Sequence, residues 1–195
     1  MIRPVEQEDA GDVAAIYRPI VEETPISFEA EAPSPDAMRS RMLDTAKDRP
    51  WLVCDLGDQI AGYAYATPHR SRGAYRWSVD SSIYVGKAFR RRGVARALYT
   101  ALFGVLRAQG YVNVFAGVTL PNPASVALHE SMGFQPVGVY RRVGYKQGAW
   151  HDVGWWQRAL QDVQAPGEIV AFDEMSSRPL VRDALQSGWE RLDTA

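Results

Sequence analysis

Apolar residues recur every three or four positions in five stretches of the chain, the spacing that places them on one face of a helix. The helices predicted in this way are residues 9–24, 34–48, 93–110, 122–134 and 180–193. In the clearest of them the apolar stripe extends from Val94 to Leu106, and Gly110 is a natural C-terminal stop. Asn122 is a suitable N-cap for the short helix that follows it.

Alternating and continuous apolar runs between these helices predict strands. They are residues 1–5, two strands within 50–69, residues 77–86 and 111–118, and two strands within 136–160. The alternation of strands with helices predicts one α/β domain over residues 1–160. The sequence changes character after Leu160, where residues 161–179 are expected to form a linker and the last helix a C-terminal tail.

Composition and charge argue against several classes of function. The 195 residues carry a net charge of −1, so no basic surface for nucleic acid is indicated. No apolar run approaches the roughly 20 residues of a membrane span, and the charged N-terminus is unlike a secretory signal. Cys54 is the single cysteine, so it forms no internal disulfide, and its apolar surroundings predict a core residue. We therefore expect a cytoplasmic protein that contacts neither membrane nor nucleic acid and holds no metal.

Three consecutive arginines, Arg90–Arg92, precede the glycine at which the clearest helix begins. A helix N-terminus offers unpaired N–H groups and a partial positive charge, and Gly93 would let an anion approach the backbone closely. The pattern Arg90-x-x-Gly93-x-Ala95 after a predicted strand therefore indicates a phosphate or pyrophosphate site. A solvated basic helix cap is the alternative for so short a motif, which matches neither a P-loop nor a dinucleotide fingerprint.

Together with "NPASVALHESMGF" at 122–134, this turn resembles the GCN5-related N-acetyltransferases (GNAT) over residues 1–160. The resemblance implies a mixed, mostly antiparallel sheet that splays at its centre, flanked by helices, and acetyl-CoA as the co-substrate. It also implies that the Val85 N–H binds the thioester carbonyl. The cofactor-binding residues implied are Val85, Arg90, Arg91, Arg92, Gly93, Val94, Ala95, Arg96, Asn122 and Ser125.

Two longer stretches, "AYRWSVDSSIYV" and "GYKQGAWHDVGWWQR", are similar to the phosphinothricin acetyltransferase branch. This likeness implies acetylation of the α-amino group of phosphinothricin, methionine sulfoximine or methionine sulfone, by direct attack in a ternary complex, and a homodimer. Other readings stay open: an acetyltransferase for another amino acid, a polyamine or a protein N-terminus, or a CoA-binding module without catalysis. A tail that docks a partner onto an ordinary enzyme is a further possibility.

Asp80 is the first candidate catalytic residue. Alternation along the strand places it with Ser82 and Tyr84 on a polar face. It stands where the branch typically carries a catalytic glutamate, and its shorter side chain favours a relay through water. A free aspartate titrates near 3.9, a poor match to an amine unless its surroundings raise that value. The alternative is a strand-end aspartate that bonds to the backbone.

His129 is the second candidate, because helical offsets of three and four place it on one face with Asn122 and Ser125. The resemblance implies a role as acid or base toward the coenzyme thiolate, and an imidazole titrates near pH 6.5. A packed histidine without a catalytic role is the alternative.

Arginines cluster just before the predicted catalytic strand, at Arg70, Arg72 and Arg76. Guanidinium groups bind carboxylate and phosphinate bidentately, so the cluster favours a small anionic substrate, with Arg72 the strongest candidate for its carboxylate. A solvated loop charge is the alternative for the other two. The substrate-binding residues implied by the resemblance are Phe28, Arg70, Arg72, Tyr75, Ser82, Tyr84 and Val153.

Overall fold

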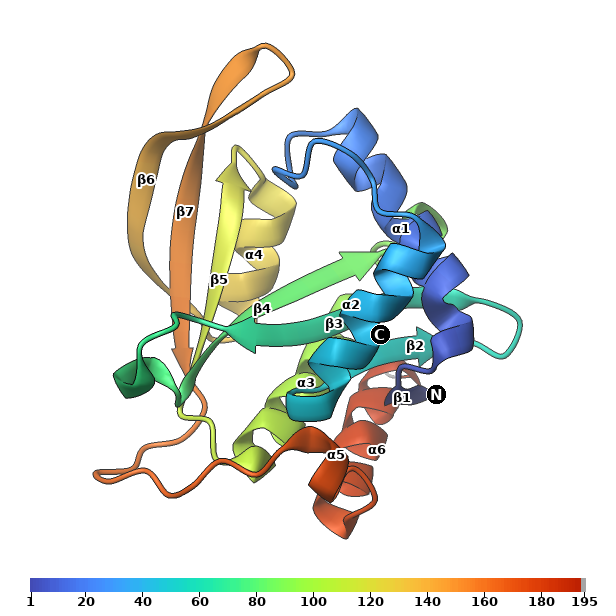
Figure 1. The fold of residues 1–195 in the computed structure, drawn as a ribbon, viewed down its shortest axis with the longest axis vertical. Coiled ribbons are helices and arrows are strands. Elements are labelled where there is room, and N and C mark those ends of the chain that lie inside the picture. Colours follow the sequence, from blue (N-terminus) through green and yellow to red (C-terminus); the bar gives the residue numbers. More distant parts are fainter. Residues whose placement is uncertain (194–195) are drawn as a thin grey trace.

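The computed structural model describes residues 1–193, which form a seven-stranded sheet with helices on both faces (Figure 1). The strands are β1 (Ile2–Pro4), β2 (Trp51–Asp55), β3 (Ile60–Pro68), β4 (Ser78–Val85), β5 (Asn113–Leu120), β6 (Gln135–Lys146) and β7 (Ala149–Ala159). Their order across the sheet is β1-β2-β3-β4-β5-β7-β6, and every neighbouring pair is antiparallel except β4 and β5. The predicted α/β fold with a mixed, mostly antiparallel sheet is confirmed.

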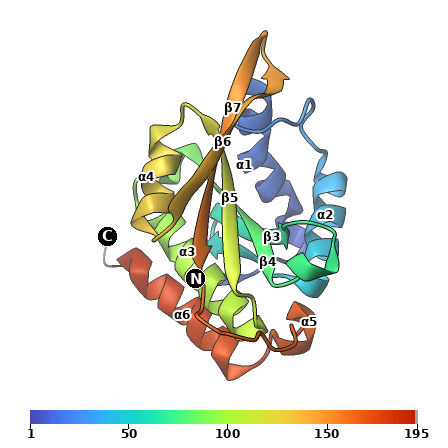
Figure 2. The ribbon, with the colours of Figure 1, turned by 90° about the vertical axis from the view of Figure 1, so that its left-hand side faces the viewer.

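Two pairs of long helices cover opposite faces of this sheet, as Figure 2 shows from the side. The helices are α1 (Ala10–Glu23), α2 (Pro35–Asp48), α3 (Val94–Gln109), α4 (Pro123–Ser131), α5 (Phe172–Met175) and α6 (Pro179–Asp193), with 3-10 turns η1 (Gln7–Asp9), η2 (Gly73–Tyr75) and η3 (Lys87–Phe89). One apolar cluster lies under α1 and α2, and a larger one lies under α3 and α6. The predicted stripe of α3 supplies the centre of the larger cluster, with Leu98, Leu102 and Leu106 fully buried.

The sheet forks between β4 and β5. These strands pair in parallel at only three positions, the last of which joins Asp80 to Phe115. Beyond that pair β4 continues beside β3 and β5 continues beside β7, so the two strands diverge (Figure 1). The edge of residues 81–85 that would face β5 is therefore left without a strand partner in the described chain, and the splayed centre expected from the resemblance is present.

The C-terminal segment packs on the domain. Helix α6 lies against α3, where glycines allow close approach: a Cβ at Gly188 would stand 2.7 Å from the Cβ of Ala101. The predicted linker contains the short helix α5, and its residues Phe172 and Met175 are buried in the core. Trp77 Nε1 also donates to the carbonyl of Gly167 at 2.7 Å. The amphipathic face of the predicted tail is thus occupied by this chain's own core, whereas the domain boundary at residue 160 stays a prediction.

Among the described residues, no helix is both long and apolar enough to cross a membrane. The hairpin of β6 and β7 extends well beyond the rest of the molecule (Figure 1). It turns at Gln147 and Gly148, whose φ values of 51° and 77° are the left-handed conformation of a tight turn.

Candidate active site

A small cleft of about 80 Å³ opens where β4 and β5 diverge. Its walls come from β4, β5, α3, α4 and the loop after α1. Five of the residues predicted from sequence line it: Ser82, Tyr84, Asn122, Ser125 and His129. They come from two separate segments of the chain, and the fork brings them together.

Helix α4 holds its three predicted residues by its own capping. The side chain of Asn122 accepts a hydrogen bond from the Ser125 N–H at 3.1 Å and so caps the helix. One turn later, Nδ1 of His129 lies 2.7 Å from the carbonyl oxygen of Ser125. The imidazole is therefore fixed against the cleft wall by the first turn of the same helix.

His129 has a second partner that the sequence did not predict. The hydroxyl of Tyr99, on α3, lies 2.9 Å from Nε2 of His129 and 3.3 Å from Oγ of Ser81. Burial lowers the pKa of His129, although the hydrogen bond to Ser125 opposes this. Tyr99 was missed because an aromatic residue inside an apolar helix is typical of a core position.

Asp80 is bonded to a side chain and not to the backbone. Its Oδ1 lies 2.6 Å from Nδ1 of His69, the first residue of the loop that follows β3. Burial raises the pKa of Asp80, while the hydrogen bond and charge of His69 and the charge of Arg70 lower it. His69 was also missed, since its only signal in the sequence is a place between a proline and the arginine cluster.

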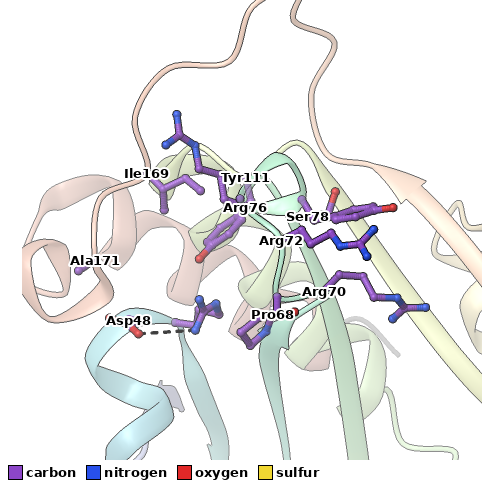
Figure 3. A pocket seen from close by; sticks show the side chains of 13 residues that line it. Asp48, Pro68, Arg70, Arg72, Arg76, Ser78, Tyr111, Ile169 and Ala171 are labelled. Atoms are coloured by element: carbon purple, nitrogen blue, oxygen red, sulfur yellow. Dashed lines mark ion pairs between the residues drawn. The ribbon is translucent and has the colours of Figure 1, made fainter.

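The predicted substrate residues fall into different places. Arg70, Arg72 and Tyr75 line a larger cavity of about 470 Å³, together with Arg49 and Arg76 (Figure 3). This cavity lies beside the start of β4, whereas Ser82 and Tyr84 line the cleft at the fork. His69 stands between the two hollows: it directly precedes Arg70 of the larger cavity in the sequence, and it contacts Asp80 at the fork.

Two predicted substrate residues line neither hollow. Phe28 lies two residues after Ile26, which lines the cleft, and a Cβ at Gly144 of β6 would overlap its ring. Val153, on β7, pairs with Thr119 of β5, another cleft residue. Both are therefore next to the cleft wall, and their roles stay predictions.

The glycine–arginine turn forms an open helix N-terminus. Gly93 has φ = 79°, a left-handed conformation that favours glycine, and no side chain caps α3. The first hydrogen bond of the helix runs from the Ala97 N–H to the Gly93 carbonyl, so the amides of residues 94–96 precede it. No acidic residue stands in the first turn, and the side chains of Arg90, Arg91, Arg92 and Arg96 are exposed. This arrangement is suited to a diphosphate.

The described residues contain no cluster of three or more His, Cys, Asp or Glu side chains that could hold a metal ion. Residues 2–155 match the family described as "Acetyltransferase (GNAT) domain". The chain belongs to the GNAT acetyltransferases.

Relatives of this acetyltransferase carry more specific names. A phosphinothricin N-acetyltransferase of Streptomyces viridochromogenes is 41% identical over 82% of this chain and 87% of its own length. An L-methionine sulfoximine/L-methionine sulfone acetyltransferase of Pseudomonas aeruginosa is 32% identical over 84% of this chain and 96% of its own. A crystal structure of a phosphinothricin acetyltransferase from Sinorhizobium meliloti in complex with acetyl-CoA superimposes with a TM-score of 0.82, at 31% identity, over 90% of this chain and 96% of that one.

The residues of this acetyltransferase fit acetyl-CoA on two features of the structure itself. The uncapped, basic N-terminus of α3 is suited to a pyrophosphate. The unpaired edge of β4 offers backbone N–H and C=O groups along residues 81–85 to an extended, amide-bearing chain. The cleft with Asn122, Ser125 and His129 faces the same fork.

Proposed function

We propose that this acetyltransferase transfers the acetyl group of acetyl-CoA to the α-amino group of a small amino-acid-like substrate of the phosphinothricin, methionine sulfoximine or methionine sulfone type. The observation that carries the proposal is the basic cavity of Arg70 and Arg72 beside the fork that holds Asp80. Relatives named for these substrates support it. The amine attacks directly in a ternary complex, because Cys54 is buried away from the cleft and offers no nucleophile there.

Acetyl-CoA supplies the activated acetyl group. Its pyrophosphate would be held by Arg90, Arg91 and Arg92 and by the backbone amides of residues 93–96. Asn122 and Ser125 would contact the pantetheine from α4. The Val85 N–H, at the end of the unpaired edge of β4, would donate to the thioester carbonyl, where negative charge develops during attack.

The arginines hold the acceptor. Arg72 binds its carboxylate and Arg70 and Tyr75 line the same cavity, where guanidinium groups meet a carboxylate or phosphinate in bidentate geometry. The other substrate residues shape the wall nearer the cleft. They are Phe28, Ser82, Tyr84 and Val153.

Asp80 and His129 handle the protons. Asp80 assists removal of a proton from the substrate ammonium, and burial raises the pKa of its carboxyl toward that task. His129, kept neutral by burial, lies at the cleft wall where a leaving thiolate would need a proton. Its route for that proton includes the Tyr99 hydroxyl at 2.9 Å.

The homodimer expected from the resemblance is part of the proposal. The β6–β7 hairpin exposes large apolar side chains, among them Tyr140, Val143, Tyr145 and Trp150, and such a patch on an extended arm suits contact with a second copy. The buried thiol of Cys54 suits a reducing compartment, and we propose a cytoplasmic location.

The test is thiol release from acetyl-CoA with phosphinothricin, methionine sulfoximine and methionine sulfone, beside simple amino acids, polyamines and peptides. We expect turnover with the first three. Turnover only with polyamines or peptides would overturn the substrate class, and binding of acetyl-CoA without any thiol release would overturn the activity.

The variant Arg72→Ala tests the acceptor site. Loss of a charge-assisted hydrogen-bonded pair is worth about 1.5–3 kcal/mol, so KM for the amino-acid substrate should rise roughly 10- to 100-fold while KM for acetyl-CoA stays unchanged. Arg18→Ala is the control, because Arg18 is half exposed on α1 and its ion pair among the described residues is with Glu22. Equal changes in both KM values would contradict the role of Arg72.

A further inference from the structure

His69 occupies the branch point of the fork. Its backbone N–H donates to the carbonyl of Ser78 at 3.3 Å, which fixes the loop against β4. Its Nδ1 lies 2.6 Å from Oδ1 of Asp80, and its ring stacks on Phe115 with centroids 4.1 Å apart and planes 12° apart. Asp80 and Phe115 form the last parallel pair before the strands diverge. One imidazole thus contacts both residues at the point where the cleft begins.

His69 lies on the side of β4 and β5 that carries several of the cleft residues. Alternation along β4 puts Asp80 on the same side as Ser82 and Tyr84, both cleft residues. Along β5 the same alternation puts Phe115 on the side of Gly117 and Thr119, which also line the cleft. His69, which contacts Asp80 and Phe115, therefore lies on the same side of the sheet as these cleft residues, and its chain neighbours Pro68 and Arg70 line the basic cavity.

The surroundings of the imidazole leave one ring nitrogen for a ligand. Tyr75 and Trp155 approach the ring edge-on at 6.0 and 6.2 Å, and Arg70 lies over the Trp155 ring at 5.7 Å. The titratable and charged groups that face the His69–Asp80 pair are thus Arg70 from the loop and Tyr75 from η2, with aromatic rings from β5 and β7. Because the carboxylate takes Nδ1–H, Nε2 is the acceptor.

We infer that His69 is the group that accepts the proton of the substrate ammonium, directly or through one water, and that Asp80 is the positioning residue that fixes its tautomer. This inference rests on the proposed function. The carboxylate of Asp80 is engaged with Nδ1 of His69, whereas Nε2 of the same imidazole is the nitrogen left to accept a proton. The side chain of His69 is 11% exposed and that of Asp80 25%, and Ser81, the residue after Asp80, lines the cleft.

The chemistry balances without any further reagent. The N–H bond of the ammonium breaks, its electron pair stays on nitrogen, and the proton moves to Nε2 of His69. The amine nitrogen then forms a bond to the acetyl carbon as the carbon–sulfur bond breaks, and the sulfur leaves with that electron pair. The remaining extra proton on nitrogen ends on the thiolate, and the imidazolium returns its proton to water.

The variants His69→Asn and Asp80→Asn separate the two possible roles. An asparagine at 69 still offers an N–H to Asp80 but accepts no proton at this pH. We expect kcat of His69→Asn to fall at least 100-fold with KM for acetyl-CoA unchanged, and the acid limb of the kcat/KM profile to disappear. The kcat of Asp80→Asn should fall less, because an asparagine oxygen still accepts a hydrogen bond from Nδ1–H of His69. The reverse order, with Asp80→Asn the more damaged, would overturn the inference.

A chemical rescue experiment tests independently whether His69 transfers a proton. In His69→Ala, added imidazole should restore turnover, and imidazoles of different pKa should give rates that follow that pKa, because they carry the proton in the transition state. Rates independent of that pKa would overturn the inference and leave His69 a structural partner of Asp80. Thermal unfolding and acetyl-CoA binding establish that each variant is folded.

His151→Asn is the matched control, since Nε2 of His151 lies 3.0 Å from the carbonyl of Lys146 and the residue has no place in the proposed chemistry. Its kcat and pH profile should be those of the parent. Failure of the parent itself to acetylate any amine would overturn the proposed function and this inference together. If the parent acetylates an amine and His69→Asn does so at the same rate, the inference is wrong but the proposed function stands.

Discussion

The hydroxyl of Tyr99 lies 2.9 Å from Nε2 of His129, and the other ring nitrogen decides which of the two atoms donates. Nδ1 faces the carbonyl oxygen of Ser125, which only accepts, so Nδ1 carries the hydrogen and Nε2 accepts from the tyrosine. Both nitrogens are thus engaged in a side chain that is 3% exposed. Protonation of His129 would reverse the bond to Tyr99, because Nε2 would become a second donor and the tyrosine hydroxyl would have to accept.

The first prediction concerns stability at acid pH. Burial lowers the pKa of native His129 below the ordinary value of 6.5, so between these two values the unfolded chain binds more protons. The contribution of His129 to the free energy of unfolding is therefore complete above pH 6.5 and declines as the pH falls toward the native pKa. Thermal unfolding from pH 7.5 to about 5 should show a smaller loss of Tm in His129→Gln than in the parent. Equal losses would contradict the assignment.

Removing the hydroxyl in Tyr99→Phe tests the same contact from the other side. The ring stays packed, but buried Nε2 of His129 loses its donor, which costs about 1–3 kcal/mol. We expect Tm to fall by several degrees and kcat to fall with it, measured by calorimetry and thiol release. Ser40→Ala, which removes an exposed hydroxyl from α2, should leave both unchanged.

Gly93→Val tests the diphosphate site. The φ of 79° at Gly93 is strained for a β-branched residue by about 1–3 kcal/mol, and the amides that follow would shift. KM for acetyl-CoA should rise at least tenfold in steady-state kinetics. Gly57→Val places the same residue at a φ of 97° in the distant β2–β3 turn, and it should destabilise the protein comparably without changing that KM. A similar rise of this KM in both variants would mean that the turn at Gly93 does not bind the diphosphate.

Close packing of α6 on α3 makes a fourth prediction. A Cβ at Gly188 would stand 2.7 Å from both the Cβ of Ala101 and the carbonyl oxygen of Ala97, and the latter is backbone that cannot move aside cheaply. Gly188→Ala should therefore lower the free energy of unfolding by about 1–3 kcal/mol, despite the better helix propensity of alanine. Gly11→Ala, in the first turn of α1 with open space around it, should be neutral or stabilising. Equal effects in a denaturant titration would mean that α6 does not pack as described.

Cys54 should be inert in the folded protein. Burial in β2 raises the pKa of its thiol to about 11, so roughly one molecule in a thousand carries a thiolate at pH 8. An aromatic disulfide reagent should therefore react with released CoA and not with the native enzyme, and it should titrate one thiol per chain after denaturation. Rapid reaction of the native protein would contradict the buried position.

Local patterns in the sequence determined the elements and much of the site. The apolar stripe of α3 fixed a helix that stops at Gly110, and its N-terminal Gly93 with the preceding arginines indicated an anion site, because both signals lie within one or two turns of chain. Asn122, Ser125 and His129 were placed together for the same reason, since helical offsets of three and four need no knowledge of the fold.

Tertiary structure alone decided which partners these residues meet. Tyr99 reaches His129 because α3 and α4 both border the fork, and His69 reaches Asp80 because the pairing of β3 with β4 brings the end of one beside the start of the other. Sheet register and helix packing set such contacts over 11 and 30 residues of chain, where periodicity carries no information. The same reason explains why Arg70 and Arg72, predicted beside Ser82 and Tyr84, line a separate cavity, and why the last helix packs against α3.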